Sequence, residues 1–218
     1  MTIAFRSSAT GQSSANTSLA VNVPAGVQDG DFLVLFVVAD TAGAAINLPP
    51  GWTALPSSPL NLGVQAACAY RIASSEPASY TVTFSGSSAG TGAVIAAYFD
   101  TVSLGLDTSG GNTFATSTTH TLTGISSAIA NEMLVCCFAS DAGTSYTPPA
   151  GMTERVDFQP STSLTLMLCD ALQASAGASG DKSATAAASD DGAGFILFIR
   201  STLSLLSDSE SLGTKANE

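Results

Sequence analysis

The sequence predicts an all-β protein, an antiparallel jelly-roll-like β-sandwich built from an internal duplication of about five strands per half. Short apolar runs rich in Val, Ile, Phe, Tyr and Thr alternate with clusters of Gly, Pro, Ser, Asn and Asp, as in strands separated by turns. No long helical pattern is present, and the Ala-rich stretch 171–188 is interrupted by Gly177 and Gly180. The third observation is a pattern that returns after about a hundred residues.

The repeated pattern is clearest around two apolar runs, each preceded by a polar turn and followed by a proline-rich turn. The matching segments, with the first-half segment named first, are 29–39 and 131–139, 49–53 and 148–153, 70–73 and 170–173, and 92–95 and 192–195. Near-constant spacing over this length indicates an internal duplication.

The candidate strands follow one another closely along both halves. In chain order they are 3–6, 18–23, 32–39, 64–72, 80–85, 93–99, 120–122, 133–139, 164–172, 183–188 and 194–200. Tyr80, Val82 and Phe84 alternate with threonines, which predicts a strand with one buried face. Trp52 directly follows a rigid Pro-Pro-Gly turn and has Met152 in its place in the second half, which favours a buried anchor.

The domain prediction is a single β-sandwich over residues 1–200, because about five strands alone would bury only a thin core. Repeat one covers about 18–104 and repeat two about 118–200, joined by a Gly/Ser/Thr-rich linker over 105–119. Two separate small sandwiches are the alternative. Residues 201–218 form a C-terminal tail, either flexible or an arm that contacts a neighbour, because its end is polar and acidic.

Composition and charge limit the possible partners. Charged residues make up 11% of the chain, against roughly 25% in ordinary soluble domains, so the surface consists largely of small polar and apolar residues that suit packing against other subunits. Six Lys and Arg against 17 Asp and Glu give a net charge of −11 without a basic cluster, which argues against nucleic acid and anionic membranes. The start shows no signal peptide, and no apolar run is long enough for a membrane helix.

Fragments of nucleophile motifs occur without a complete catalytic set. The segment 86–90 matches the G-x-S-x-G string of a nucleophile elbow, but it joins two β runs and is predicted to be a hairpin turn. His120, the only histidine, is predicted to be a surface or edge residue. The four cysteines, Cys68, Cys136, Cys137 and Cys169, lie in apolar runs without metal-ligand spacing and are predicted to be small buried hydrophobes.

Paired carboxylates are the remaining candidates for chemistry. The pairs at 29/31 and 190/191 are interpreted as turns that precede strands, and Asp40 and Asp141 as matching loop positions after strands. A weak calcium site at one of the pairs is the alternative. We therefore predict no enzyme activity and no catalytic, cofactor-binding or metal-binding residues.

Several of these segments resemble duplicated β-sandwich (jelly-roll-like) structural proteins of tailed bacteriophages and prophages. The matching segments are 23–27, 30–34, 49–53, 70–73, 76–81, 148–155 and 174–180. The resemblance implies a non-enzymatic virion protein of the capsid decoration (cement) or tail accessory type, made in the host cytoplasm. It also implies a homo-oligomer, trimer or dimer, whose partners are the major capsid protein or other virion proteins.

The alternative function is a tail fibre or tail accessory module that binds carbohydrate or a receptor. Such modules use exposed aromatic side chains, and the candidates here are Trp52, Tyr146 and Phe158. The remaining candidate interaction residues are apolar residues of the tail, which could dock on a neighbouring subunit: Leu203, Leu205 and Leu206.

Overall fold

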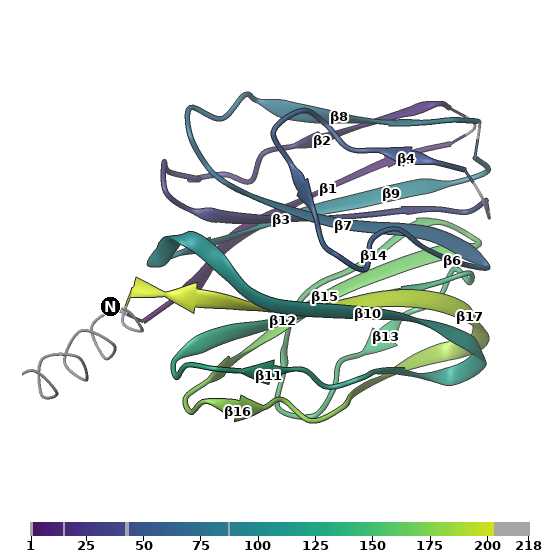
Figure 1. Cartoon of the computed structure of the whole chain (residues 1–218). Helices are drawn as coiled ribbons and strands as arrows, with labels where there is room; N and C mark the ends of the chain where they lie inside the picture. Colours follow the sequence, from purple (N-terminus) through teal and green to yellow (C-terminus); the bar gives the residue numbers. More distant parts are fainter. Residues whose placement is uncertain (1, 15, 42–43, 87, 203–218) are drawn as a thin grey trace, which may run out of the picture.

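The computed structural model describes residues 2–14, 16–41, 44–86 and 88–202, and these residues form an all-β protein of stacked layers (Figure 1). Adjacent strands pair antiparallel in both halves. None of the described residues belongs to a helix that is long and apolar enough to cross a membrane. The predicted fold class, an all-β antiparallel sandwich, is confirmed.

The first half consists of a large inner sheet and a small outer sheet. The inner sheet has the order β1 (Ala4–Ser13), β9 (Thr91–Phe99), β3 (Phe32–Ala39), β7 (Val64–Ile72) and β5 (Thr53–Ala54), with β6 (Leu60–Leu62) also paired to β7. The outer sheet has the order β2 (Ser18–Asn22), β8 (Ser79–Phe84) and β4 (Ile46–Asn47). The strands from β1 to β5 alternate between the two sheets, as do those from β7 to β9, which is typical of a jelly roll.

A hydrophobic core fills the space between these two sheets. Leu33, Leu35 and Val37 of β3 belong to the same buried cluster as Val82 and Phe84 of β8. The predicted alternation of β8 is confirmed, because its residues are exposed and buried in turn. Every residue of β3 is buried, since this strand is covered on both faces, and this explains its continuous apolar run.

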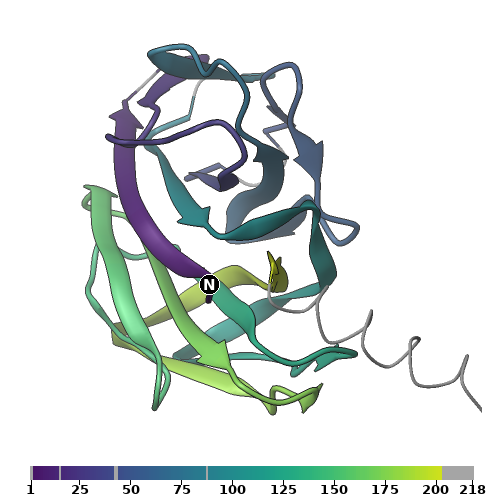
Figure 2. The same cartoon turned by 90° about the vertical axis from the view of Figure 1, so that its left-hand side faces the viewer.

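The second half repeats this arrangement with longer strands. Its main sheet has the order β10 (Thr101–Leu122), β17 (Lys182–Ser201), β12 (Glu132–Ser140), β15 (Leu164–Gln173) and β14 (Thr153–Ser161), with β13 (Tyr146–Thr147) also paired to β17. β11 (Ser126–Ser127) and β16 (Gly177–Ala178) form a separate small pair. β10 and β17 bend from the inner layer into the outer layer, so this half curls around its own core (Figure 2).

Strand order and register agree between the halves. In the first half Phe36 of β3 lies opposite Cys68 and Val94, and in the second half Cys137 of β12 lies opposite Leu168 and Phe195. This is the arrangement that an internal duplication would produce, and the duplication itself stays a prediction.

The inner sheets of the two halves pack face to face around a third, shared core. At its centre the rings of Phe36 and Phe195 meet edge to face, with centroids 6.0 Å apart. At one side the guanidinium of Arg155, on β14, lies 4.6 Å from the ring centroid of Phe5, on β1. The Tyr98 hydroxyl of the first half donates to the Asp170 carboxylate of the second at 3.1 Å.

Some sequence-based boundaries are wrong. Residues 105–119 are not a linker but part of β10, a strand of 22 residues that pairs with β17. The segments 183–188 and 194–200 belong to a single strand, β17. β14 was not expected, because an edge strand that is partly exposed has no continuous apolar face to mark it.

Candidate functional site

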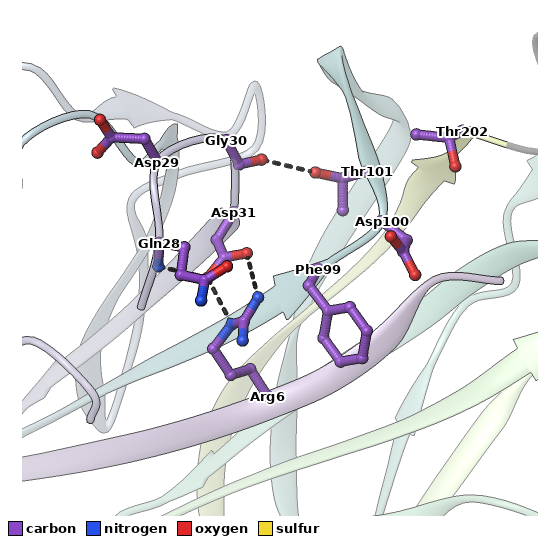
Figure 3. Close-up of a pocket in the computed structure, with 9 residues that line it drawn as sticks. All are labelled: Arg6, Gln28, Asp29, Gly30, Asp31, Phe99, Asp100, Thr101 and Thr202. Atoms are coloured by element: carbon purple, nitrogen blue, oxygen red, sulfur yellow. Dashed lines mark hydrogen bonds and ion pairs between the residues drawn. The ribbon is translucent and has the colours of Figure 1, made fainter. Parts of the chain in front are cut away.

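A polar hollow of about 530 Å³ lies where the two halves join and where the described chain ends (Figure 3). The turn before β3, the crossing from β9 to β10 and the residue after β17 surround it. Its lining residues are Arg6, Gln28, Asp29, Gly30, Asp31, Phe99, Asp100, Thr101 and Thr202.

An ion pair occupies the floor of the hollow. Arg6 Nε and Nη2 donate to the two carboxylate oxygens of Asp31 at 2.6 and 2.9 Å. Asp31 is 4% exposed and also accepts the backbone N–H of Gln28 at 2.9 Å. The Arg6 guanidinium lies 4.8 Å from the ring centroid of Phe99. This bidentate pair holds β1 against the turn before β3, so the arginine has a structural role.

The walls of the hollow are fixed by backbone contacts. Gly30 has φ of 94°, which suits glycine, and its N–H donates to the carbonyl of Ala73 at 2.9 Å. The Thr101 hydroxyl donates to the Gly30 carbonyl at 3.1 Å, and the Thr202 N–H donates to the Asp100 carbonyl at 2.9 Å. The hollow is therefore a preformed junction of three chain segments.

Carboxylates set the chemistry that the hollow can support. Asp29 and Gly30 form a turn, and the Asp31 N–H donates to the Gln28 carbonyl at 3.1 Å, which confirms the interpretation of this acidic pair as a turn. The Asp29 carboxylate also accepts the N–H of Ser75 at 2.7 Å. The described lining residues include three aspartates, Asp29, Asp31 and Asp100, and a single arginine, Arg6. The hollow can therefore accept a cationic group by charge.

A buried carboxyl that sequence reasoning missed lies in the second half. Glu132 is fully buried, accepts a hydrogen bond from the Ser127 hydroxyl, and lies near Asp107, which pairs with Arg200. Burial, followed by the Asp107 carboxylate, raises the pKa of Glu132 to about 7. Its position in the sequence repeat, matching Asp31, is the signal that could have found it.

Four further acidic residues, Asp40, Asp141, Asp190 and Asp191, lie near one another at the opposite end of the sheets. Burial and the neighbouring Asp40 carboxylate raise the pKa of Asp141 to about 6. Asp40 accepts a hydrogen bond from Ser163 of the other half, and Asp191 accepts one from Thr116 at 2.5 Å. The predicted turn at 190/191 is wrong, because both residues lie inside β17 where it bends. In the part of the chain that the structure describes, no three potential ligands group as a metal site.

The nucleophile-like string is a structural corner. Ser88 is 1% exposed, and its hydroxyl donates to the carbonyl of Gly90 at 2.8 Å. The predicted hairpin is wrong, because β8 and β9 lie in different sheets and the loop carries the chain between them. A buried hydroxyl already engaged with the backbone is poorly placed to attack a substrate.

His120 is not a surface or edge residue, as the sequence predicted, but fully buried. Its Nδ1 lies 2.6 Å from the Tyr146 hydroxyl and its Nε2 lies 3.1 Å from the carbonyl of Asp190. Its ring stacks on Phe114 with centroids 4.7 Å apart, and burial lowers the pKa of the imidazole. The prediction failed because β10, which carries His120, is far longer than its apolar pattern indicates.

The aromatic candidates for glycan binding face inward. Trp52 and Tyr146 are 8% and 5% exposed, and Phe158 is half-buried against the shared core. Trp52 meets Tyr80 edge to face with centroids 5.3 Å apart, which confirms it as a buried anchor. The structure does not bring the three aromatic residues into one surface patch, since they belong to different hydrophobic clusters. Leu203, Leu205 and Leu206 lie outside the described residues.

The cysteines behave as predicted. All four are buried and free, and burial raises the pKa of the Cys136 and Cys137 thiols. These two neighbours lie on opposite faces of β12, Cys137 in the shared core and Cys136 in the core of the second half. Buried, protonated thiols are poor nucleophiles and poor metal ligands.

Comparison of the chain with protein-family models, with curated proteins and with solved structures finds no match.

Proposed function

We propose that the protein is a non-enzymatic structural component of a tailed-phage virion, most directly a capsid decoration (cement) protein that stabilises the shell through subunit packing. One observation carries the proposal: the side chains that could bind or react with a ligand are instead engaged in holding the fold together. The four described arginines each lie within 4.0 Å of a carboxylate, and the histidine and all four cysteines are buried.

The surface supports a role in packing. Few charges cover it, so a close contact with another subunit desolvates few ions. The edge strands of the two inner sheets lie near each other, β1 near β14 and β10 near β6. Neighbouring strands at these edges leave less room for strand addition, so contact through the side faces is the favoured mode of packing.

The charge balance supports a partner with basic side chains. The net charge is −11, and the hollow at the junction of the halves carries Asp29 and Asp100 near its rim. A lysine or arginine of a neighbouring subunit would find a counter-charge there. The partners proposed are the major capsid protein, other virion proteins and further copies of this chain as a trimer or dimer.

The alternative, a carbohydrate- or receptor-binding tail module, has less support. Trp52 and Tyr146 are buried, and Phe158 is half-covered by the shared core. Sugar recognition by stacking requires an exposed aromatic face.

Addition of the purified protein to particles assembled without it tests the proposal. We expect saturable binding at a fixed number of copies per head and a higher melting temperature of the shell. As a matched pair, Asp100→Lys tests the hollow and Asp181→Lys makes the same charge change outside it. If the protein does not bind to the heads and binds to host cells instead, the proposal is wrong and the receptor-binding alternative holds.

A further inference from the structure

Each half has an equivalent position at the end of its inner sheet. In the first half, this position is filled by side chains of that half. The rings of Trp52 and Tyr80 meet there at 5.3 Å, and the Arg71 guanidinium lies 5.3 Å from the Tyr80 ring centroid. Glu76 completes the cluster, with one carboxylate oxygen 2.9 Å from Arg71 Nη2 and the other accepting the Tyr80 hydroxyl at 2.5 Å. In the first half, aromatic rings therefore fill the apolar space and Glu76 pairs with the charge of Arg71.

Hydrogen bonding and register identify the equivalent residues of the second half. Trp52 corresponds to Met152, because the N–H of each donates to a proline carbonyl three residues earlier. Arg71 corresponds to Ala171, because each lies opposite a leucine, on β3 and on β12 respectively. Tyr80 corresponds to Lys182, because each lies four residues before the residue that pairs with the first residue of β4 or β13.

The smaller side chains of the second half leave a hollow of about 290 Å³. Leu134, Met152 and Ala171 give it apolar walls, and Leu172 at its side is 45% exposed. This volume is just below the range of roughly 300–1,000 Å³ typical of small-molecule pockets. The hollow therefore fits one or two apolar side chains.

A cation without a carboxylate partner lines the same hollow. Lys182 Nζ donates to the carbonyl of Ser179 at 2.5 Å, and no described carboxylate forms an ion pair with it. The described arginines all have such a partner. The hollow thus lacks both the apolar filling and the carboxylate, Glu76, that complete the first half.

We propose that this hollow binds the C-terminal segment of the same chain, with a leucine in the apolar space and a carboxylate beside Lys182. The segment has the required order, because Leu203, Leu205 and Leu206 are followed by Asp208 and Glu210. The segment would supply the apolar filling that Trp52 and Tyr80 supply in the first half, and the carboxylate that Glu76 supplies there.

The segment starts close enough to reach the hollow. Ile199 and Leu172 both lie opposite Met133, on strands at either side of β12. They are therefore about 10 Å apart, at roughly 4.8 Å per strand. Thr202 follows shortly after Ile199, and the four residues from there to Leu206 span up to about 14 Å. A tether of this length holds the segment at roughly millimolar effective concentration, which favours docking within one chain.

Cysteine cross-linking in the full chain tests the inference, because the native cysteines are buried. Leu172→Cys combined with Leu206→Cys, oxidised with copper phenanthroline, should give an intrachain disulfide that runs as a monomer. The control pairs Leu62→Cys with Leu206→Cys, since Leu62 is 37% exposed but lies on β6, at the opposite end of the sheets (Figure 1). We expect about tenfold more intrachain product from the first pair.

Charge reversal at Lys182 provides the second arm. Lys182→Glu in the Leu172/Leu206 variant should lower the cross-linking yield about fivefold while the thermal unfolding curve is retained. Equal yields from the Leu62 control would overturn the inference. Disulfide-linked dimers in place of monomers would also overturn it, by showing that the segment binds a neighbouring copy. The outcome is independent of the proposed virion function, since it is read on the isolated chain.

Discussion

Glu132 is the residue whose burial has the clearest consequence for stability. Its pKa is raised from 4.5 to about 7 in the folded protein, so the folded state binds the proton more tightly than the unfolded state. Stability therefore falls as the pH rises from 4.5 to about 7, and the full penalty is present above that range.

Glu132→Gln should remove this penalty. At pH 8 we expect the variant to be more stable than the natural protein by about 2 kcal/mol, and near pH 4 the two should differ little. Urea unfolding at a series of pH values measures this difference. Asp141→Asn is the matched control, because the pKa of Asp141 is raised only to about 6 and its effect should be complete at a lower pH. Parallel pH curves for Glu132→Gln and the natural protein would contradict the account.

The contact between β10 and β17 depends on a glycine. A Cβ atom at Gly194 would lie 2.6 Å from the Cys137 carbonyl oxygen and 2.8 Å from Phe114. The carbonyl belongs to the paired strand β12, so it cannot move away without breaking the sheet. The absence of a side chain at this position lets the Phe114 ring of β10 cover β17.

Gly194→Ala should destabilise the protein by about 1–3 kcal/mol through overpacking. Gly86→Ala is the control, since a Cβ there meets nothing within 4 Å, and its effect should stay within about 0.5 kcal/mol. Chemical denaturation of both variants measures the difference. Equal stability of the two variants would mean that β10 packs less closely than described.

Strands with a continuous or alternating apolar pattern were predictable from the sequence, including the edge strand β2, and mainly polar strands were not. The bounds 32–39 and 64–72 agree with β3 and β7, because continuous apolar runs mark strands covered on both sides. The sequence predicts a linker over residues 105–119 of β10, since this partly exposed stretch is rich in Gly, Ser and Thr and carries no apolar pattern. The buried His120 was missed with it. In the hollow where the two halves join, only the turn at Asp29 was predictable from the sequence. The other contacts of the hollow join residues that are far apart in the chain.

The shared core makes the two halves depend on each other. Phe36, Phe195 and the other residues between the inner sheets would be exposed to water if the halves separated. Burying such apolar area contributes about 25 cal/mol per Å². The molecule should therefore unfold as one unit although each half has its own second core.

A single calorimetric transition is the expected result, with equal calorimetric and van't Hoff enthalpies. Phe36→Ala and Phe195→Ala should each lower the midpoint of that one transition, at a cost of about 3–5 kcal/mol. Two resolved transitions, with each variant affecting only one of them, would show instead that the halves are independent domains.

The central claim, that the protein acts by packing into a virion, is tested most directly by its copy number. Quantitative mass spectrometry of purified particles gives this number relative to the major capsid protein. A ratio near one, or a simple fraction of it, is the result that a decoration protein predicts. A few copies per particle would move the protein to the tail, and its complete absence from particles would contradict the account.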